Sequence, residues 1–145
     1  MLSGRLTHAA LRLLDRVATT SSSPSHLRTG RRGEEDAYFY LRKRGYVMVA
    51  RNFRSPRHHG EIDLIGWDKD VLCFIEVKTR TTRDVKPAEA AVDRKKRRDL
   101  RKVAREYLRS VSLLRQWRFD VVTVHYEGDS LHPTFELFQN ASLSS

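Results

Sequence analysis

The chain has 145 residues, 39% of them hydrophobic and 32% charged, which suits a single globular domain with its own core. No apolar run approaches the roughly 20 residues of a membrane span, so we expect no membrane association and a cytoplasmic protein. The net charge of +10 is concentrated in residues 1–33, with six Lys or Arg against one acid, and in residues 87–115, with ten against four. This distribution favours a polyanionic partner, most simply nucleic acid.

The first predicted element is an amphipathic helix near the N-terminus. Its apolar residues recur at helical spacing: Leu6, Ala9, Ala10, Leu13, Leu14 and Val17. A linker of Thr, Ser and Pro follows over residues 19–25. The segment also has the composition of an organellar transit peptide, but we favour an N-terminal extension of a bacterial-type protein. The predicted boundaries are 1–29 for the helix and linker, 30–139 for the main domain and 140–145 for a Ser-rich tail.

Residues 30–44 are predicted to form the first helix of the main domain, which ends at Gly45. Four residues recur at helical spacing and form the stripe expected to face the sheet: Glu34, Ala37, Tyr38 and Leu41. Glu34 is the acidic member of this stripe. The alternative interpretation of Glu34 is an ordinary first-turn acid favoured by the helix dipole. Residues 46–53 then read as the first strand.

The next stretch predicts a β-hairpin, because residues 62–67 and 71–77 are rich in β-branched and aromatic side chains around a polar turn. A two-residue loop places Asp63 directly opposite Glu76, with Cβ atoms about 5 Å apart. Both strands are apolar on both faces, where an unpaired charge is costly. Two facing carboxylates in such a setting predict a shared cation, Mg²⁺ or Mn²⁺.

Strict alternation along the hairpin places Glu61, Asp63 and Ile65 on one side of its first strand. Lys78 follows Glu76 on the same face of the second strand, roughly 7 Å further along, within reach of a water or phosphate. Two carboxylates, a lysine and a metal are the components of a phosphodiester-hydrolysis site. The alternative is a strand with ordinary surface charges, since an isolated Glu-x-Lys is a weak motif. Glu61 receives no role, and the lone cysteine, Cys73, is expected to be a buried thiol.

A second helix is predicted from residue 87 or 88 to about residue 112. Basic residues crowd its first half: Arg94, Lys95, Lys96, Arg97, Arg98, Arg101, Lys102 and Arg105. A charge run is often only a solvated face, but here we favour phosphate contacts. Residues 118–126 and 131–138 alternate as strands, and Pro133 confines the last strand to a sheet edge.

Several motifs in this order resemble the YraN-like family of predicted endonucleases, within the PD-(D/E)XK nuclease superfamily. The similarity spans residues 30–124. The matching residues are Gly33-Glu34 with Ala37, Asn52-Phe53-Arg54, Gly60-Glu61-Ile62-Asp63-Leu64-Ile65, Phe74-Ile75-Glu76-Val77-Lys78-Thr79-Arg80, Lys96, and Arg118-Phe119-Asp120-Val121-Val122.

The resemblance implies an α/β fold with a restriction-endonuclease-like αβββαβ core, in which helices flank a mixed central sheet. It also implies metal ligation by Asp63 and Glu76, catalysis by Lys78, and a contribution from Glu34 on the first helix. Lys96 would approach the substrate phosphate. The complete predicted nucleic-acid-binding set is Lys95, Lys96, Arg97, Arg98, Arg101 and Arg80.

The predicted function is that of a Mg²⁺- or Mn²⁺-dependent endonuclease acting on nucleic acid, with DNA favoured over RNA. Branched DNA is a further expectation, because the superfamily includes junction resolvases. The alternative is a non-catalytic nucleic-acid-binding module of the same fold that acts with a DNA-processing partner. The sequence leaves the choice between monomer and dimer open.

Overall fold

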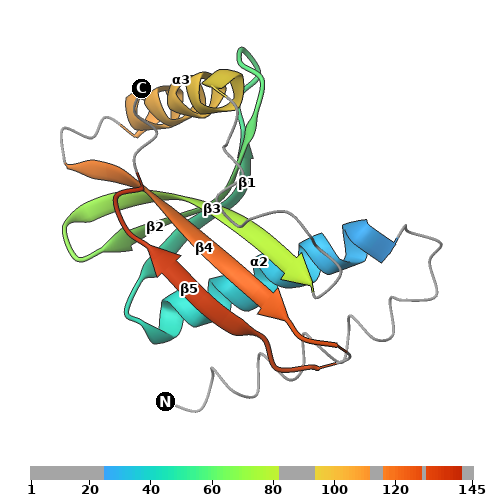
Figure 1. Ribbon diagram of the computed structural model, residues 1–145. Coiled ribbons are helices and arrows are strands. Elements are labelled where there is room, and N and C mark those ends of the chain that lie inside the picture. Colours follow the sequence, from blue (N-terminus) through green and yellow to red (C-terminus); the bar gives the residue numbers. More distant parts are fainter. Residues whose placement is uncertain (1–24, 82–93, 112–115, 129, 142–145) are drawn as a thin grey trace.

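The computed structural model describes residues 25–81, 94–111, 116–128 and 130–141 (Figure 1). The predicted N-terminal helix lies outside the described residues, as do residues 19–24 of the linker, the start of the second helix before residue 94 and the end of the tail. Within the described parts, the elements in chain order are α2 (Ser25–Lys43), β1 (Val47–Arg54), β2 (Glu61–Asp68), β3 (Val71–Thr81), α3 (Arg94–Ser110), β4 (Trp117–Tyr126) and β5 (Thr134–Phe138). Helix α2 thus begins five residues before its predicted start at Gly30.

The five strands form one sheet in the order β1-β2-β3-β4-β5. Strands β3 and β4 are parallel, whereas every other neighbouring pair is antiparallel. Helix α3 lies between the two parallel strands in sequence, as a parallel connection requires. The predicted mixed sheet is confirmed, and so is the edge position of the last strand. With α2 and α3 flanking the sheet, the architecture is an α/β fold with a restriction-endonuclease-like core.

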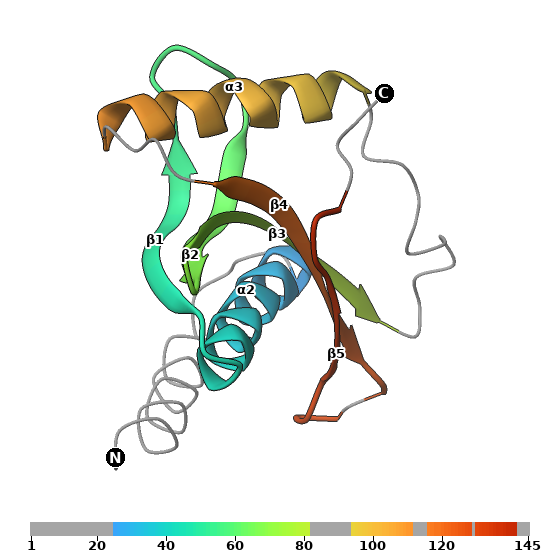
Figure 2. The same cartoon turned by 90° about the vertical axis from the view of Figure 1, so that its left-hand side faces the viewer.

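The two helices cover different faces of the sheet (Figures 1 and 2). Alternation along β3 sends Cys73 and Ile75 into one core cluster and Leu72 and Phe74 into the other. The cluster beneath α2 contains Ala37, Leu41, Leu64, Ile75, Val122 and Val124, and the cluster beneath α3 contains Ile62, Ile65, Phe74, Leu100, Val103 and Ala104. Burial of each large side chain contributes roughly 1.5–3 kcal/mol, so both helices are held firmly against the central hairpin.

Helix α2 approaches β3 very closely at one residue. A Cβ atom added at Gly33 would lie 1.9 Å from the Thr79 hydroxyl oxygen, a distance at which atoms cannot coexist. Glycine is therefore required at this position. The close contact brings the next residue of the helix, Glu34, to the edge of the β2–β3 hairpin.

Helix α3 crosses the hairpin formed by β1 and β2 near the connection between these strands (Figure 2). The ring of Tyr107 packs edge-on against Phe53, with centroids 5.0 Å apart, and Ser55 donates a hydrogen bond to Glu106. These contacts hold the second half of α3 against the end of β1.

The pairing between β1 and β2 skips Asn52 and Asp63, which would face each other. Asn52 has a left-handed backbone conformation with φ 49°. Beyond this point the strand changes its orientation: Leu64 lies in the cluster beneath α2, but Ile62, two residues away, lies beneath α3 together with Ile65. The predicted strict alternation from Glu61 to Ile65 is therefore wrong, because the strand twists at Asp63.

Candidate active site

The register of the β2–β3 hairpin brings Asp63 and Glu76 together. The strands join through a two-residue turn, and their ladder pairs Leu64 with Ile75, so the next residues along the two strands are Asp63 and Glu76. Instead of a further ladder pair, the Asp63 carboxylate accepts a hydrogen bond from the Val77 backbone N–H, with an Oδ2 to N distance of 2.8 Å. The strands separate where the two carboxylates meet.

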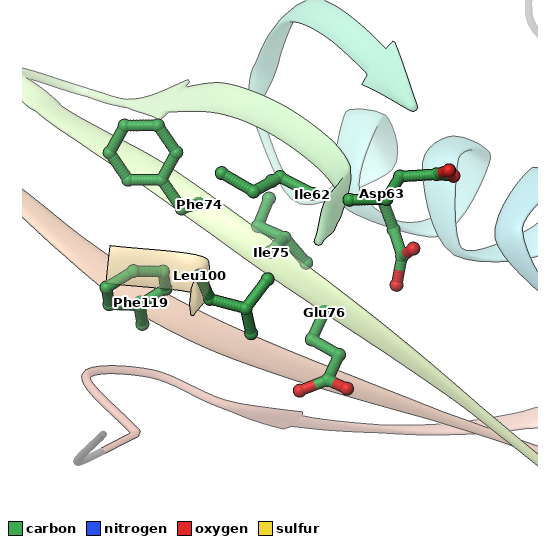
Figure 3. Close-up of a pocket in the computed structure, with 8 residues that line it drawn as sticks. Ile62, Asp63, Phe74, Ile75, Glu76, Leu100 and Phe119 are labelled. Atoms are coloured by element: carbon green, nitrogen blue, oxygen red, sulfur yellow. The ribbon is translucent and has the colours of Figure 1, made fainter. Parts of the chain in front are cut away.

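Both carboxylates line a small hollow between the hairpin and α3 (Figure 3). In the close-up, apolar side chains occupy one end of the hollow and the carboxylates of Asp63 and Glu76 lie at the other. The apolar lining residues are Ile62, Phe74, Ile75, Leu100 and Phe119. The hollow is therefore poor in groups that solvate negative charge.

The two carboxylates are incompletely compensated. The pKa of Asp63 is raised from 3.8 to about 7, mainly by burial and also by the negative charges of Glu34 and Glu76. The Val77 hydrogen bond and the Lys96 charge oppose this rise. The Lys96 ammonium pairs with one oxygen of Glu76. The other oxygen, Oε2, is buried without a hydrogen-bond partner. A buried acceptor without a donor is rare in folded proteins and calls for an explanation.

Lys78 lies on the same face of β3 as Glu76, as predicted, and is half-buried. Its side chain makes no hydrogen bond or ion pair with any other described residue. Arg80 continues the row and donates to the Thr79 carbonyl oxygen, with Nη1 3.3 Å from that oxygen, while its Nε atom is buried without a partner. Lys78 thus lies on the face of the acidic pair, and its ammonium group forms no ion pair with either carboxylate.

The predicted basic residues of α3 differ in their exposure and in their contacts. Lys96 reaches Glu76, and the neighbouring Arg97 is half-buried with its Nε atom lacking a partner. Lys95 and Arg98 are exposed, and Arg101 is intermediate. Lys96, although exposed, thus borders the acidic pair through its contact with Glu76.

Glu34 and Glu61 are joined by a residue to which the sequence analysis gave no role. Asn52 Nδ2 donates to Glu34 Oε2 at 3.1 Å and to Glu61 Oε1 at 2.9 Å. Arg54 pairs with the other oxygen of Glu61. The available signal was an Asn inside a predicted strand, a residue type depleted in strands and tolerant of the left-handed conformation.

The donor set fits a hard divalent cation that keeps much of its water. No three His, Cys, Asp or Glu side chains are grouped closely enough to hold a metal ion in the part of the chain that the structure describes. Mg²⁺, however, usually binds through one or two carboxylates and completes its coordination with water and substrate phosphates. Asp63 and the unpartnered Glu76 Oε2 supply such a pair.

The fold and this acidic pair define the class of protein: an α/β protein with a restriction-endonuclease-like core and two facing carboxylates on its central hairpin. The chain belongs to the uncharacterised protein family UPF0102, whose model matches residues 33–124. The predicted family, known as YraN-like, is thereby confirmed.

Relatives extend the match to nearly the whole chain. A UPF0102 protein of Koribacter versatilis is 56% identical over 139 residues, which cover 96% of each chain. A UPF0102 protein of Solibacter usitatus is 45% identical over 116 residues, covering 78% of this chain and 84% of the relative. The names of these relatives state family membership alone.

Among the described residues, no helix is both long and apolar enough to cross a membrane.

Proposed function

We propose that this protein is a metal-dependent endonuclease that hydrolyses phosphodiester bonds in nucleic acid, with DNA as the favoured substrate. The observation that carries the proposal is the pair of half-buried carboxylates on the hairpin, one with its pKa raised to about 7 and the other with a buried oxygen that has no donor. A strand interior gains nothing in stability from this arrangement. A divalent cation would compensate both groups at once.

Asp63 and Glu76 would hold Mg²⁺ or Mn²⁺, and Glu34 would assist directly or through water. Such a cation, when bound, polarises a phosphoryl oxygen and makes a water molecule more acidic. Lys78, free of other partners among the described residues, would orient that water or stabilise negative charge that develops on the phosphate. Lys96 and Arg97 would bind the substrate backbone at the rim of the site.

The alternative, a nucleic-acid-binding module without catalysis, draws on the ion pair between Lys96 and Glu76. If that pair persists when nucleic acid is bound, Lys96 compensates Glu76 permanently and no cation is needed. Both functions use the basic surface of α3, so binding alone does not separate them.

Cleavage assays separate the two functions. The full-length protein is incubated with labelled linear, flapped and four-way DNA and with RNA, with and without Mn²⁺. We expect Mn²⁺-dependent cleavage that Asp63→Asn and Glu76→Gln abolish, whereas Lys78→Ala still binds Mn²⁺ but cleaves poorly. Glu127→Gln, which removes an exposed acid after β4, is the matched control and should cleave like the wild type. Binding without cleavage in every combination would support the module instead.

A further inference from the structure

Asn52 combines an unusual backbone with an unusual set of partners. Its φ of 49° lies in the left-handed region, and the ladder skips it. Its side-chain amide donates to one carboxylate on α2 and to another on β2, those of Glu34 and Glu61. One NH₂ group thus joins two acids that are 27 positions apart in sequence and would otherwise repel each other.

The requirements of the backbone do not explain the choice of side chain. Glycine meets the need for a positive φ, and Asp tolerates it about as well as Asn does. Aspartate, however, would add a third negative charge between Glu34 and Glu61. Of the residues that accept this conformation readily, Asn is the one whose side chain donates to both carboxylates at once.

The two acids differ in how else they are held. Glu61 has a second partner in Arg54, which neutralises its charge. Within the described residues, Asn52 is the only hydrogen-bond partner of the Glu34 side chain. Asn52 stands across from Asp63 in the pairing of β1 with β2, so the Glu34 carboxylate that Asn52 holds lies on the side of Asp63, and its negative charge raises the pKa of Asp63. Asn52 therefore determines where Glu34 stands relative to the hairpin acids.

We propose that Asn52 is a positioning residue of the cation site, which holds the Glu34 carboxylate beside Asp63 while Glu61 stays paired with Arg54. This inference rests on the proposed function. It assigns to Glu34, acting through Asn52, a place beside the two cation ligands from which it assists through water, and to Glu61 a supporting place outside the ligand set.

Titration calorimetry with Mn²⁺ on the full chain tests the proposal. Asn52→Gly keeps the left-handed backbone but removes the amide, and we expect Mn²⁺ affinity to fall about 10–100-fold, as is usual when a residue that orients a ligand is lost. Because Asn52 acts through Glu34, adding Asn52→Gly to Glu34→Gln should weaken binding no further. Asn140→Gly, at the left-handed residue with φ 51°, is the control and should bind like the wild type.

A metal-free measurement separates failure of this proposal from failure of the proposed function. In the apo protein, the Asn52 side-chain amide protons should give NMR signals displaced from those of a free Asn amide, and these signals should move in Glu34→Gln and in Glu61→Gln. Mn²⁺ affinity unchanged in Asn52→Gly, or additive losses in the double variant, would overturn the positioning role. A wild type that binds no Mn²⁺ would refute the nuclease site, and the NMR signals would still decide whether Asn52 holds the two acids.

Discussion

Two acidic clusters lie on opposite faces of the same sheet: one is centred on Asp120 and the other consists of Asp63 and Glu76. They differ in how many donors surround their carboxylates. On the face toward α2, Asp120 is 1% exposed and accepts hydrogen bonds from the Tyr46 hydroxyl at 3.0 Å, from Arg118 Nε at 2.8 Å and from the Asn140 backbone N–H at 2.9 Å. Every donor comes from a different part of the chain. Asp120 is thus a charge whose desolvation is fully compensated.

On the face toward α3, the acids meet few donors. Asp63 accepts one described backbone hydrogen bond, and one oxygen of Glu76 accepts none. The comparison teaches that burial of an acid does not by itself indicate its purpose. A carboxylate with a complete set of donors stabilises the fold, whereas a carboxylate without donors can bind a ligand.

The largest expected effect is on the free energy of unfolding and tests whether Asp120 stabilises the fold. Asp120→Asn removes one of the two carboxylates that pair with the Arg118 guanidinium, which is only 17% exposed, and should destabilise the protein by about 3 kcal/mol. Asp63→Asn should not destabilise it at all. Urea unfolding monitored by circular dichroism measures both free energies. Equal losses in the two variants would erase the distinction between the clusters.

A pH series sharpens the comparison further. The pKa of Asp63 is raised from 3.8 to about 7 in the folded protein, so ionisation of this group destabilises the fold as pH rises through that window, by about 1.4 kcal/mol per pH unit. Asparagine cannot ionise. The advantage of Asp63→Asn over the wild type should therefore grow by roughly 2–3 kcal/mol between pH 5 and pH 8.

The measurement is urea unfolding of both proteins at pH 5, 6, 7 and 8 without divalent cations. Glu127→Gln serves as the control, because its acid is exposed and its difference from the wild type should not change with pH. An Asp63→Asn advantage that stays constant from pH 5 to pH 8 contradicts the raised pKa.

We call the cluster with few hydrogen-bond donors, formed by Asp63 and Glu76, the unsatisfied cluster. Much of it was predictable from sequence, because it depends on local pairing. The short polar turn and the two-residue period of the strands were enough to place Asp63 opposite Glu76, and helical spacing placed Glu34 on the stripe of α2 that faces the sheet. The twist at Asp63 was not predictable, because it follows from the left-handed Asn52 on a neighbouring strand.

The contacts of the satisfied cluster, which is the hydrogen-bonded network around Asp120, could not be predicted from the sequence. Tyr46, Asp68, Arg118 and Gln139 join Asp120 in one network, with Arg118 Nη2 2.7 Å from Asp68 Oδ2 and Gln139 Nε2 3.0 Å from the Tyr46 hydroxyl. Tyr46 and Gln139 are separated by 93 positions, and no local pattern links residues across such a distance. Arg118 and Asp120 were recognised only as part of a family motif, and their contacts now explain the motif as structural.

Cation binding should produce a smaller effect, confined to the unsatisfied cluster. At a free concentration ten times Kd, Mn²⁺ should stabilise the wild type by about 1.4 kcal/mol and should leave Glu76→Gln unchanged. Because Asp63 holds a proton below pH 7, binding at pH 6 should release protons and binding at pH 8 should release almost none. Calorimetry in two buffers with different ionisation enthalpies measures this release. Equal release at both pH values would place the cation elsewhere.

The smallest expected effect concerns the basic residues on the side of the unsatisfied cluster. Arg97 and Arg101 are four positions apart on α3, so they share one ridge of the helix, and Lys96 beside them reaches Glu76. If nucleic acid approaches the acidic pair, its phosphates pass this ridge. The exposed Lys102 and Arg105, further along α3, provide a control that removes the same charge.

Replacing Arg97 and Arg101 with alanine should lower the slope of log affinity against log salt by about 1.8 on B-DNA, since each lost phosphate contact removes about 0.9. The Lys102→Ala/Arg105→Ala control should lower it by much less, because those exposed residues lie further along α3 from Lys96, which contacts Glu76. Sequence preference should stay unchanged in both variants, since contacts to phosphate carry no base information. Fluorescence anisotropy from 50 to 300 mM salt measures the slopes. Identical slopes in the two variants would mean that nucleic acid responds to the overall charge of α3, and that the acidic cluster does not lie on the binding face.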